Sequence, residues 1–139
     1  MRLLGSLVAG AALLSGCGGD DAAGTFCPAS AVVALVRVEV PRSAVAGGPV
    51  TATLCLEGEC AASGVVVTGT QLVTSRPMID AAPKTLRVRL DLREHGQVVL
   101  TASGRIPTRQ VSDRSGPCKQ TAVSAVARYD PASRSLTAG

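Results

Sequence analysis

The chain has 139 residues, a length typical of one domain, and 14 basic against 10 acidic side chains give it a net charge of +4 at pH 7. A charge this small and dispersed argues against a nucleic-acid-binding protein. There is no Trp, one Phe and one Tyr, so the chain also lacks the flat rings on which single-stranded nucleic acids and sugars stack.

Residues 1–16 have the pattern of an export signal. Arg2 provides a positive start, and residues 3–14 are almost wholly apolar. This apolar run is too short to cross a bilayer, which takes roughly 20 residues. Two small residues, Ser15 and Gly16, then lead directly into Cys17. We therefore expect residues 1–16 to be a signal peptide that is removed.

The tetrapeptide Leu14-Ser15-Gly16-Cys17 resembles the lipobox of bacterial lipoproteins, in which an aliphatic residue and two small residues precede a cysteine. The resemblance implies diacylglycerol on the Cys17 thiol, cleavage before Cys17, and a further acyl chain such as palmitate on the freed amine. The protein is then exported and anchored by lipid to the cell membrane or the outer membrane. The alternative is a conventional signal peptide followed by an incidental cysteine.

Residues 17–25 follow as a lipidated N-terminus and tether. After Cys17 they are small or polar, with nothing to bury. A flexible chain of this length has a typical span of roughly 15–20 Å. We therefore expect the domain, residues 26–139, to lie close to the bilayer.

The other four cysteines are expected to form two disulfides, because an even number in an exported chain indicates a disulfide framework. Three pairings are open. We prefer Cys55–Cys60, which flanks a short polar turn, with Cys27–Cys118 as the remaining bridge. A zinc site is the alternative, but only the first pair approaches the spacing of a zinc knuckle. No metal or other cofactor is expected.

Most of the domain has the period-two alternation of β-strands. The clearest case is the run from Leu86 to Arg93, followed by a turn at residues 94–97 and a second alternating run in which Val98, Leu100 and Ala102 share one face. Similar patterns occur at residues 32–40, 50–57, 65–67, 70–74, 120–129 and 133–137. About seven short strands with turns between them indicate an all-β, antiparallel sandwich. Its core must consist of Val, Leu and Ala, so we expect stability to depend on the disulfides.

This pattern resembles the immunoglobulin-like sandwich domains of small exported bacterial lipoproteins. The matching stretches are Cys27-Pro28, Thr53-Leu54-Cys55 with Cys60 across the turn, and Gly116-Pro117-Cys118. The chain departs from antibody-type domains because it has no core Trp, and because Tyr129 follows Cys118 instead of preceding it. The resemblance therefore implies an architecture and no antibody-like function.

No residue pattern indicates catalysis. His95 is the single histidine and is expected to be an exposed turn residue, with no nucleophile motif to serve. Glu57 and Glu59 flank Gly58 and could share a calcium ion, but calcium needs six to eight oxygen ligands. We interpret this acidic pair as a solvated hairpin tip.

The stretch from Gly104 to Lys119 shows no strand pattern and is expected to be a long basic loop. It carries Arg105, Arg109, Arg114 and Lys119. Loops at the end of a sandwich often bind partners, so this candidate binding loop could meet anionic lipid, a wall polymer or an acidic protein. The alternative is a loop whose charges are only solvated.

These features favour a membrane-anchored envelope lipoprotein that is a non-catalytic interaction or structural module. Its expected partners are the membrane, through the lipid on Cys17, and an envelope protein or wall polymer. The alternatives are a small-ligand or metal-binding envelope lipoprotein and, less favoured, an envelope hydrolase. The oligomeric state stays open.

Overall fold

The structure, a computed structural model, describes residues 34–79, 82–113 and 120–139. Within these ranges the chain is all-β: it forms ten strands and one short 3-10 helix, η1 (Arg42–Ala44). The strands are β1 (Leu35–Pro41), β2 (Val50–Leu56), β3 (Glu59–Ser63), β4 (Val65–Thr68), β5 (Gln71–Pro77), β6 (Thr85–Glu94), β7 (Gln97–Pro107), β8 (Arg109–Asp113), β9 (Gln120–Asp130) and β10 (Ser135–Ala138). In these same ranges there is no helix long and apolar enough to cross a membrane.

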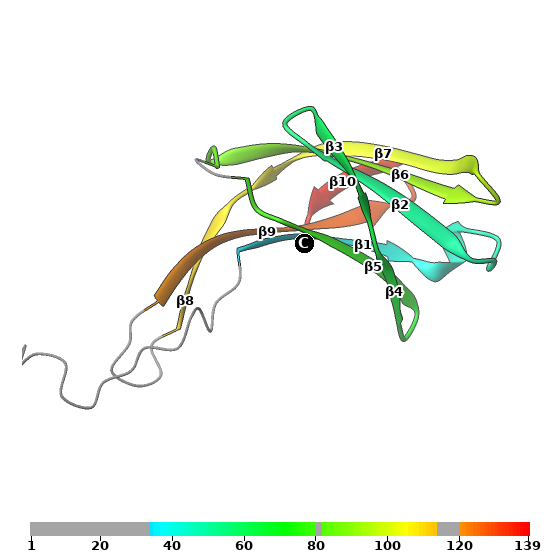
Figure 1. Cartoon of the computed structure of the whole chain (residues 1–139), viewed down its shortest axis with the longest axis horizontal. Coiled ribbons are helices and arrows are strands. Elements are labelled where there is room, and N and C mark those ends of the chain that lie inside the picture. Colours follow the sequence, from blue (N-terminus) through cyan, green and yellow to red (C-terminus); the bar gives the residue numbers. More distant parts are fainter. Residues whose placement is uncertain (1–33, 80–81, 114–119) are drawn as a thin grey trace, which may run out of the picture.

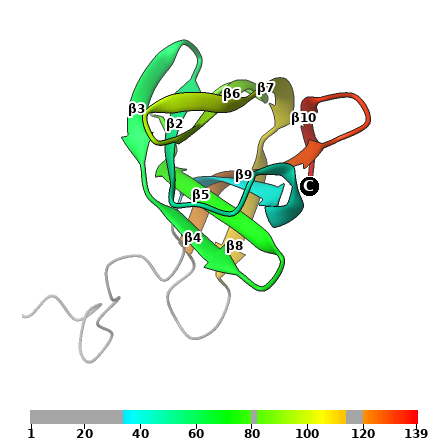
Figure 2. The same cartoon turned by 90° about the vertical axis from the view of Figure 1, so that its right-hand side faces the viewer.

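The strands form two sheets that pack on one core (Figures 1 and 2). Sheet A has the order β10-β9-β1-β5-β4, with β8 also paired to β9, and sheet B has the order β3-β2-β6-β7. The expectation of an all-β chain in two layers is confirmed. Two details are corrected, because the described residues hold ten strands instead of about seven, and because β1 and β9 pair in parallel. Alternating patterns reveal strands but not the direction in which distant strands pair.

Two tight turns fix the hairpins of sheet B. Glu57 and Gly58 join β2 to β3 with φ values of 49° and 87°, and His95 and Gly96 join β6 to β7 with 51° and 78°. Positive φ at both central residues is the type I′ geometry, whose twist matches that of the flanking strands. A glycine at the second position adopts this conformation without steric cost. One turn fixes the register of β2 with β3, and the other fixes that of β6 with β7.

The core lies between the sheets and is built from aliphatic side chains at alternating positions. The largest fully buried side chains are Leu54, Leu56, Leu86, Leu90, Leu92, Ile106, Val36, Val38, Val40 and Val88. Burial of each such side chain stabilises the fold by about 1.5–3 kcal/mol. The expected Val, Leu and Ala core is therefore confirmed, with Ile106 added and Tyr129 packed against its edge.

A β-bulge changes the face of one predicted residue. The pairing of β6 with β7 runs from Leu92↔Leu100 to Arg93↔Val98, which leaves Val99 as an extra residue. Leu100 and Ala102 are buried as the alternation predicts, but Val98 is 51% exposed. The prediction that Val98 shares their face is therefore wrong. The extra residue interrupts the period of two, so Val98 points to solvent.

The predicted loop over residues 104–119 is also wrong for its first ten residues. Residues 104–107 belong to β7 in sheet B, and residues 109–113 form β8, which pairs with β9 in sheet A. At Thr108 the chain passes from one sheet to the other, with the Thr108 N–H donating to the Lys84 carbonyl at 2.9 Å. Ile106 is buried and Val111 is 42% exposed, so these strands carry no alternating apolar signal.

Gly104 allows sheet B to close against the last strand of sheet A. A Cβ atom at this position would collide with the carbonyl oxygen of Leu136 in β10. The side chain of Leu136 is itself buried in the core. Gly104 is therefore required here because the backbones of β7 and β10 approach closely.

Candidate functional site

The residues predicted to carry function fall partly outside the structure. Among them, Cys17, Cys27, Arg114, Cys118 and Lys119 lie outside the described residues, as do the proposed signal peptide and tether. Cys55, Cys60, Arg105 and Arg109 are described. A candidate site is therefore sought around these four residues.

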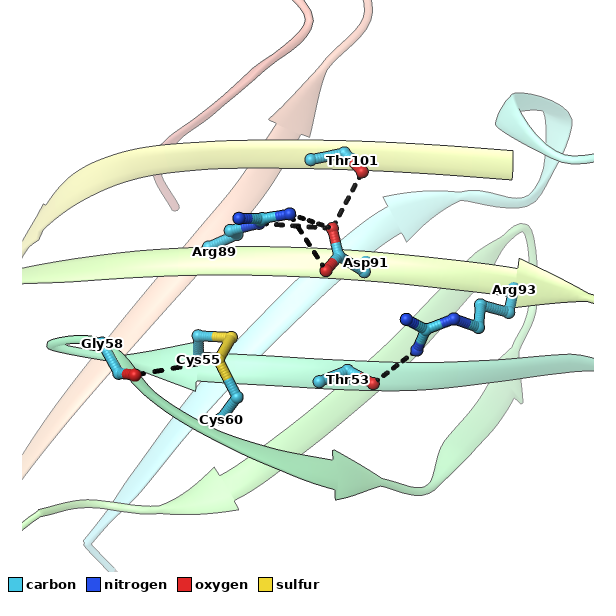
Figure 3. A network of polar contacts seen from close by, with 8 residues as sticks. All are labelled: Thr53, Cys55, Gly58, Cys60, Arg89, Asp91, Arg93 and Thr101. Carbon is cyan, nitrogen blue, oxygen red and sulfur yellow. Dashed lines mark hydrogen bonds and ion pairs between the residues drawn. A yellow bond between two sulfur atoms is a disulfide. The ribbon is translucent and has the colours of Figure 1, made fainter. Parts of the chain in front are cut away.

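Cys55 and Cys60 are joined by a disulfide, the pair that the sequence favoured. They are directly opposite each other on β2 and β3, with their Cα atoms 3.9 Å apart. The bond lies on the outer face of sheet B, where Cys60 is exposed and Cys55 is buried (Figure 3). It fixes the β2–β3 hairpin from the solvent side.

The structure separates the two described members of the predicted basic loop. Arg105 lies on β7 in sheet B, directly opposite Arg87 on β6. Arg109 lies on β8 in sheet A, and its Nη2 atom is 3.5 Å from the carbonyl oxygen of Gly139. The switch between sheets at Thr108 separates them. They therefore do not belong to one loop.

Arg105 instead joins a group of arginines that the sequence analysis did not single out as a site. Leu86, Val88, Leu90 and Leu92 are buried, so the residues between them on β6 face outward. We call the outward arginines of sheet B the cationic face: Arg87, Arg89, Arg93 and Arg105. The sequence already placed arginines two residues apart on the polar side of β6. That Arg105 of β7 lies beside them follows only from the register of β6 with β7.

Asp91 partly neutralises this face. Its carboxylate accepts a hydrogen bond from the Thr101 hydroxyl at 2.8 Å and forms an ion pair with Arg89, with Nη2 3.3 Å from Oδ2. Although it points outward, Asp91 is only 8% exposed, because these neighbours cover it (Figure 3). Arg93 contacts no carboxylate in the described residues and donates to the Thr53 hydroxyl at 2.9 Å.

Glu57 is fixed to the start of β6 by Arg87. Its carboxylate accepts hydrogen bonds from the Arg87 backbone N–H at 2.6 Å and from Arg87 Nε at 3.1 Å, while the Glu57 N–H donates to the Arg87 carbonyl. The backbone hydrogen bond is the main reason that the pKa of Glu57 lies below its ordinary value. Glu57 is therefore not the freely solvated tip residue that the sequence predicted.

The calcium alternative gains no support from the described residues. Glu57 commits both carboxylate oxygens to Arg87, and no group of three or more metal-binding side chains occurs in the described ranges. His95 is exposed in its turn, as expected. Its neighbour Glu94 is buried and accepts a hydrogen bond from the Ala46 N–H at 3.0 Å, so it holds the loop before β2.

An open hollow of about 440 Å³ lies on the cationic face, above the disulfide. Its lining includes Arg87, Arg89, Arg105, Ser103, Cys55 and Cys60. The register places Cys60, Cys55, Arg89 and Ser103 in one row across β3, β2, β6 and β7. Among the described residues, no acidic side chain lines this hollow.

A second hollow of about 580 Å³ lies on the other side of the β2–β3 hairpin. Its lining consists of the charged residues Glu57, Glu59 and Arg76 and the apolar residues Pro77, Met78 and Ile79. Arg76 Nη1 already donates to the carbonyls of Leu54 and Glu59, at 2.8 and 2.5 Å, and so ties β5 to the hairpin. We therefore assign a structural role to Arg76. The hollow over the disulfide is the candidate site.

The candidate site is suited to binding an anion. Guanidinium groups present N–H donors in a planar fork that matches carboxylate and phosphate oxygens. Arg105 forms no ion pair with any side chain of the described residues, so its donors are available. No protein-family model, no curated protein and no solved structure matches this chain.

Proposed function

We propose that the chain is a membrane-anchored lipoprotein of the cell envelope that acts as a non-catalytic interaction module. Removal of residues 1–16 exposes Cys17, which carries the lipid, and residues 17–25 tether the domain outside the cytoplasm. The support is the sequence Leu14-Ser15-Gly16-Cys17 after an apolar run, followed by small and polar residues.

We further propose that the domain, residues 26–139, is immunoglobulin-like and carries a second disulfide between Cys27 and Cys118. The strand order supports the first point, because β3-β2-β6-β7 and β4-β5-β1 match the C′CFG and DEB orders of immunoglobulin sheets. The parallel pairing of β1 with β9 supports the second, because it brings the starts of both strands to the same end of sheet A.

The observation that carries the interaction role is the cationic face. Arg87 and Arg105 lie directly opposite each other on adjacent antiparallel strands. Like charges in this position destabilise a sheet. Such a local conflict is expected where a surface serves binding instead of stability. The partner that fits is an anionic envelope component, either an acidic protein or a wall polymer.

Photo-crosslinking in intact cells tests both parts of this proposal. We expect the unaltered chain to fractionate with membranes and to crosslink to an envelope component. Cys17→Ser should release the folded domain, because attachment depends on the lipid. Arg87→Gln with Arg105→Gln should remove the crosslink while leaving membrane attachment intact.

A matched control replaces two arginines on the other sheet, Arg37→Gln with Arg128→Gln, and should keep the crosslink. Membrane fractionation of Cys17→Ser after a high-salt wash, which releases proteins held by charge alone, would contradict the anchor. An unchanged crosslink in the variant without Arg87 and Arg105 would contradict the role of the cationic face.

A further inference from the structure

The hollow above the Cys55–Cys60 disulfide brings together positive charges that the described residues neutralise only in part. Arg87, Arg89 and Arg105 line it. Arg89 pairs with Asp91 and Arg87 pairs with Glu57, and both acids lie outside the lining. Arg105 is exposed and has no ion-pair partner in the part of the chain that the structure describes. Three guanidinium groups therefore face two carboxylates, which leaves one positive charge in excess.

The donors of the hollow come from two strands that the register holds together. Directly opposite side chains on antiparallel strands have Cβ atoms about 4.5–5.5 Å apart, so the guanidinium groups of Arg87 and Arg105 can reach one ligand. Ser103 is directly opposite Arg89 and adds a hydroxyl beside it. The β6–β7 turn fixes the two strands that carry these side chains, and the disulfide fixes the neighbouring β2–β3 hairpin. The donors are thus arranged before any ligand arrives.

Glu57 holds the Arg87 side chain in place through two hydrogen bonds. It takes the Arg87 backbone N–H and Nε, which leaves the two terminal nitrogens of that guanidinium without a partner in the described residues. The contact also restrains the long side chain, so less conformational entropy is lost on binding. A glutamate is ionised at neutral pH, so the ion pair between Glu57 and Arg87 is present there.

We infer that this hollow is a binding site for a phosphoryl group, with Arg87 and Arg105 as a guanidinium pair and Ser103 as a third donor. The inference rests on the proposed function, because it names the chemistry of the anion that the cationic face recognises. A phosphoryl group carries up to two negative charges and three acceptor oxygens, which suits donors converging from two strands. The volume of about 440 Å³ leaves room for its substituent to lie over the disulfide.

The test is an NMR titration of the full chain that observes arginine Nε–H signals. The probes are inorganic phosphate and glycerol phosphate, against sodium chloride and sodium acetate at equal ionic strength. We expect saturable shifts at Arg87 and Arg105 with both phosphates and not with the other salts. Arg105→Ala should weaken phosphate binding roughly tenfold or more, the loss expected for a hydrogen-bonded charge.

The matched control is Arg42→Ala, which removes one exposed arginine from η1 and should leave phosphate affinity unchanged. Arg105→Lys keeps the charge but loses the fork, and its phosphate affinity should be intermediate. The backbone amide spectrum of each variant reports whether the fold is intact. An equal loss in Arg42→Ala would overturn the site, because it would reveal only an effect of net charge.

A vesicle arm identifies the source of the phosphoryl group. Phosphatidylcholine vesicles with and without phosphatidic acid are compared with soluble glycerol phosphate. A large preference for phosphatidic acid vesicles that is lost in Arg105→Ala supports the site and assigns a lipid headgroup. Equal occupancy by the soluble probe supports it and assigns a phosphate-bearing polymer or small molecule.

No saturable shift with any phosphate probe, or equal shifts with acetate, would overturn the inference. If the crosslink in cells still depended on Arg87 and Arg105, the proposed function would stand and the anion would be a carboxylate. Loss of both results would remove the cationic face as a binding surface altogether.

Discussion

On the outer face of sheet A, Arg37 and Arg128 bond to one carboxylate, that of Glu39, at 3.1 and 3.0 Å. On the outer face of sheet B, Arg87 and Arg105 face each other directly, and only Arg87 has an acidic partner in the described residues. Both sheets therefore carry exposed arginines. In sheet A two of them share the carboxylate of Glu39, whereas in sheet B two of them are direct neighbours with no carboxylate shared between them. We therefore propose that the pairing of arginines across strands, more than their number, makes the outer face of sheet B a binding face.

The largest expected effect tests whether the two faces belong to one folding unit. Leu90→Ala removes a fully buried side chain from the centre of sheet B, and such a change typically costs about 2–5 kcal/mol of unfolding free energy. Because the core is shared, amides of β1 in sheet A should lose hydrogen-exchange protection together with those of β6. If β1 kept its protection, the two sheets would unfold as separate units, which would contradict a shared core.

The disulfide should have the next largest effect. In the chain-entropy model, closing the small loop between Cys55 and Cys60 stabilises the fold by about 2 kcal/mol. Replacing both residues by Ala should lower the urea midpoint without changing the sheet A ion pairs. An unchanged midpoint would show that the β2–β3 hairpin is held by its turn and by Arg76 alone.

Asp91→Asn tests whether a carboxylate beside the hollow weakens phosphate binding. The substitution weakens contacts with Thr101 and Arg89 and should cost about 1–2 kcal/mol of stability. It also removes a negative charge beside the hollow, so phosphate should bind more tightly than to the unaltered chain. Glu39→Gln on sheet A removes the same charge far from the hollow and should leave phosphate affinity unchanged. Equal gains in both variants would mean that only net charge matters.

The smallest effect is a pH dependence at Glu57. Its folded-state pKa is lowered below 4.5, chiefly by the hydrogen bond from the Arg87 N–H, so its contribution to stability is complete above that value and is lost as the pH falls through the lowered pKa. The melting temperature of Glu57→Gln should therefore lie below that of the unaltered chain at pH 7, and the difference should shrink in acid. A constant difference down to pH 2 would contradict the contact with Arg87.

Much of the fold could be predicted from the sequence because the signals were local. The period of two from Leu86 to Arg93 located β6, and the glycines at positions 58 and 96 marked tight turns. The parallel pairing of β1 with β9 could not be predicted, since it joins segments far apart in the chain. The end of β7 and the whole of β8 were not predicted. After Gly104 only Ile106 is a fully buried apolar residue of β7, so the sequence shows no alternation there.

The candidate site was less accessible from the sequence than the fold. Arg105 was singled out, but in a loop with Arg109, because nothing local marks the switch between sheets at Thr108. Arg87 and Arg89 were seen only as the polar half of a strand pattern. They form a site only because the register places Arg105 and Ser103 of β7 opposite them and because the disulfide lies beside them. That register exists only in the folded sheet.

We expect the outer face of sheet B, and not that of sheet A, to bind anions. The most direct measurement is the salt concentration at which the full chain elutes from a phosphate-bearing cation-exchange resin. Two variants are compared that lose the same charge: Arg87→Gln with Arg105→Gln, and Arg37→Gln with Arg128→Gln. We predict that the first elutes at much lower salt and the second close to the unaltered chain. Equal shifts, or a larger shift for the second, would contradict the account.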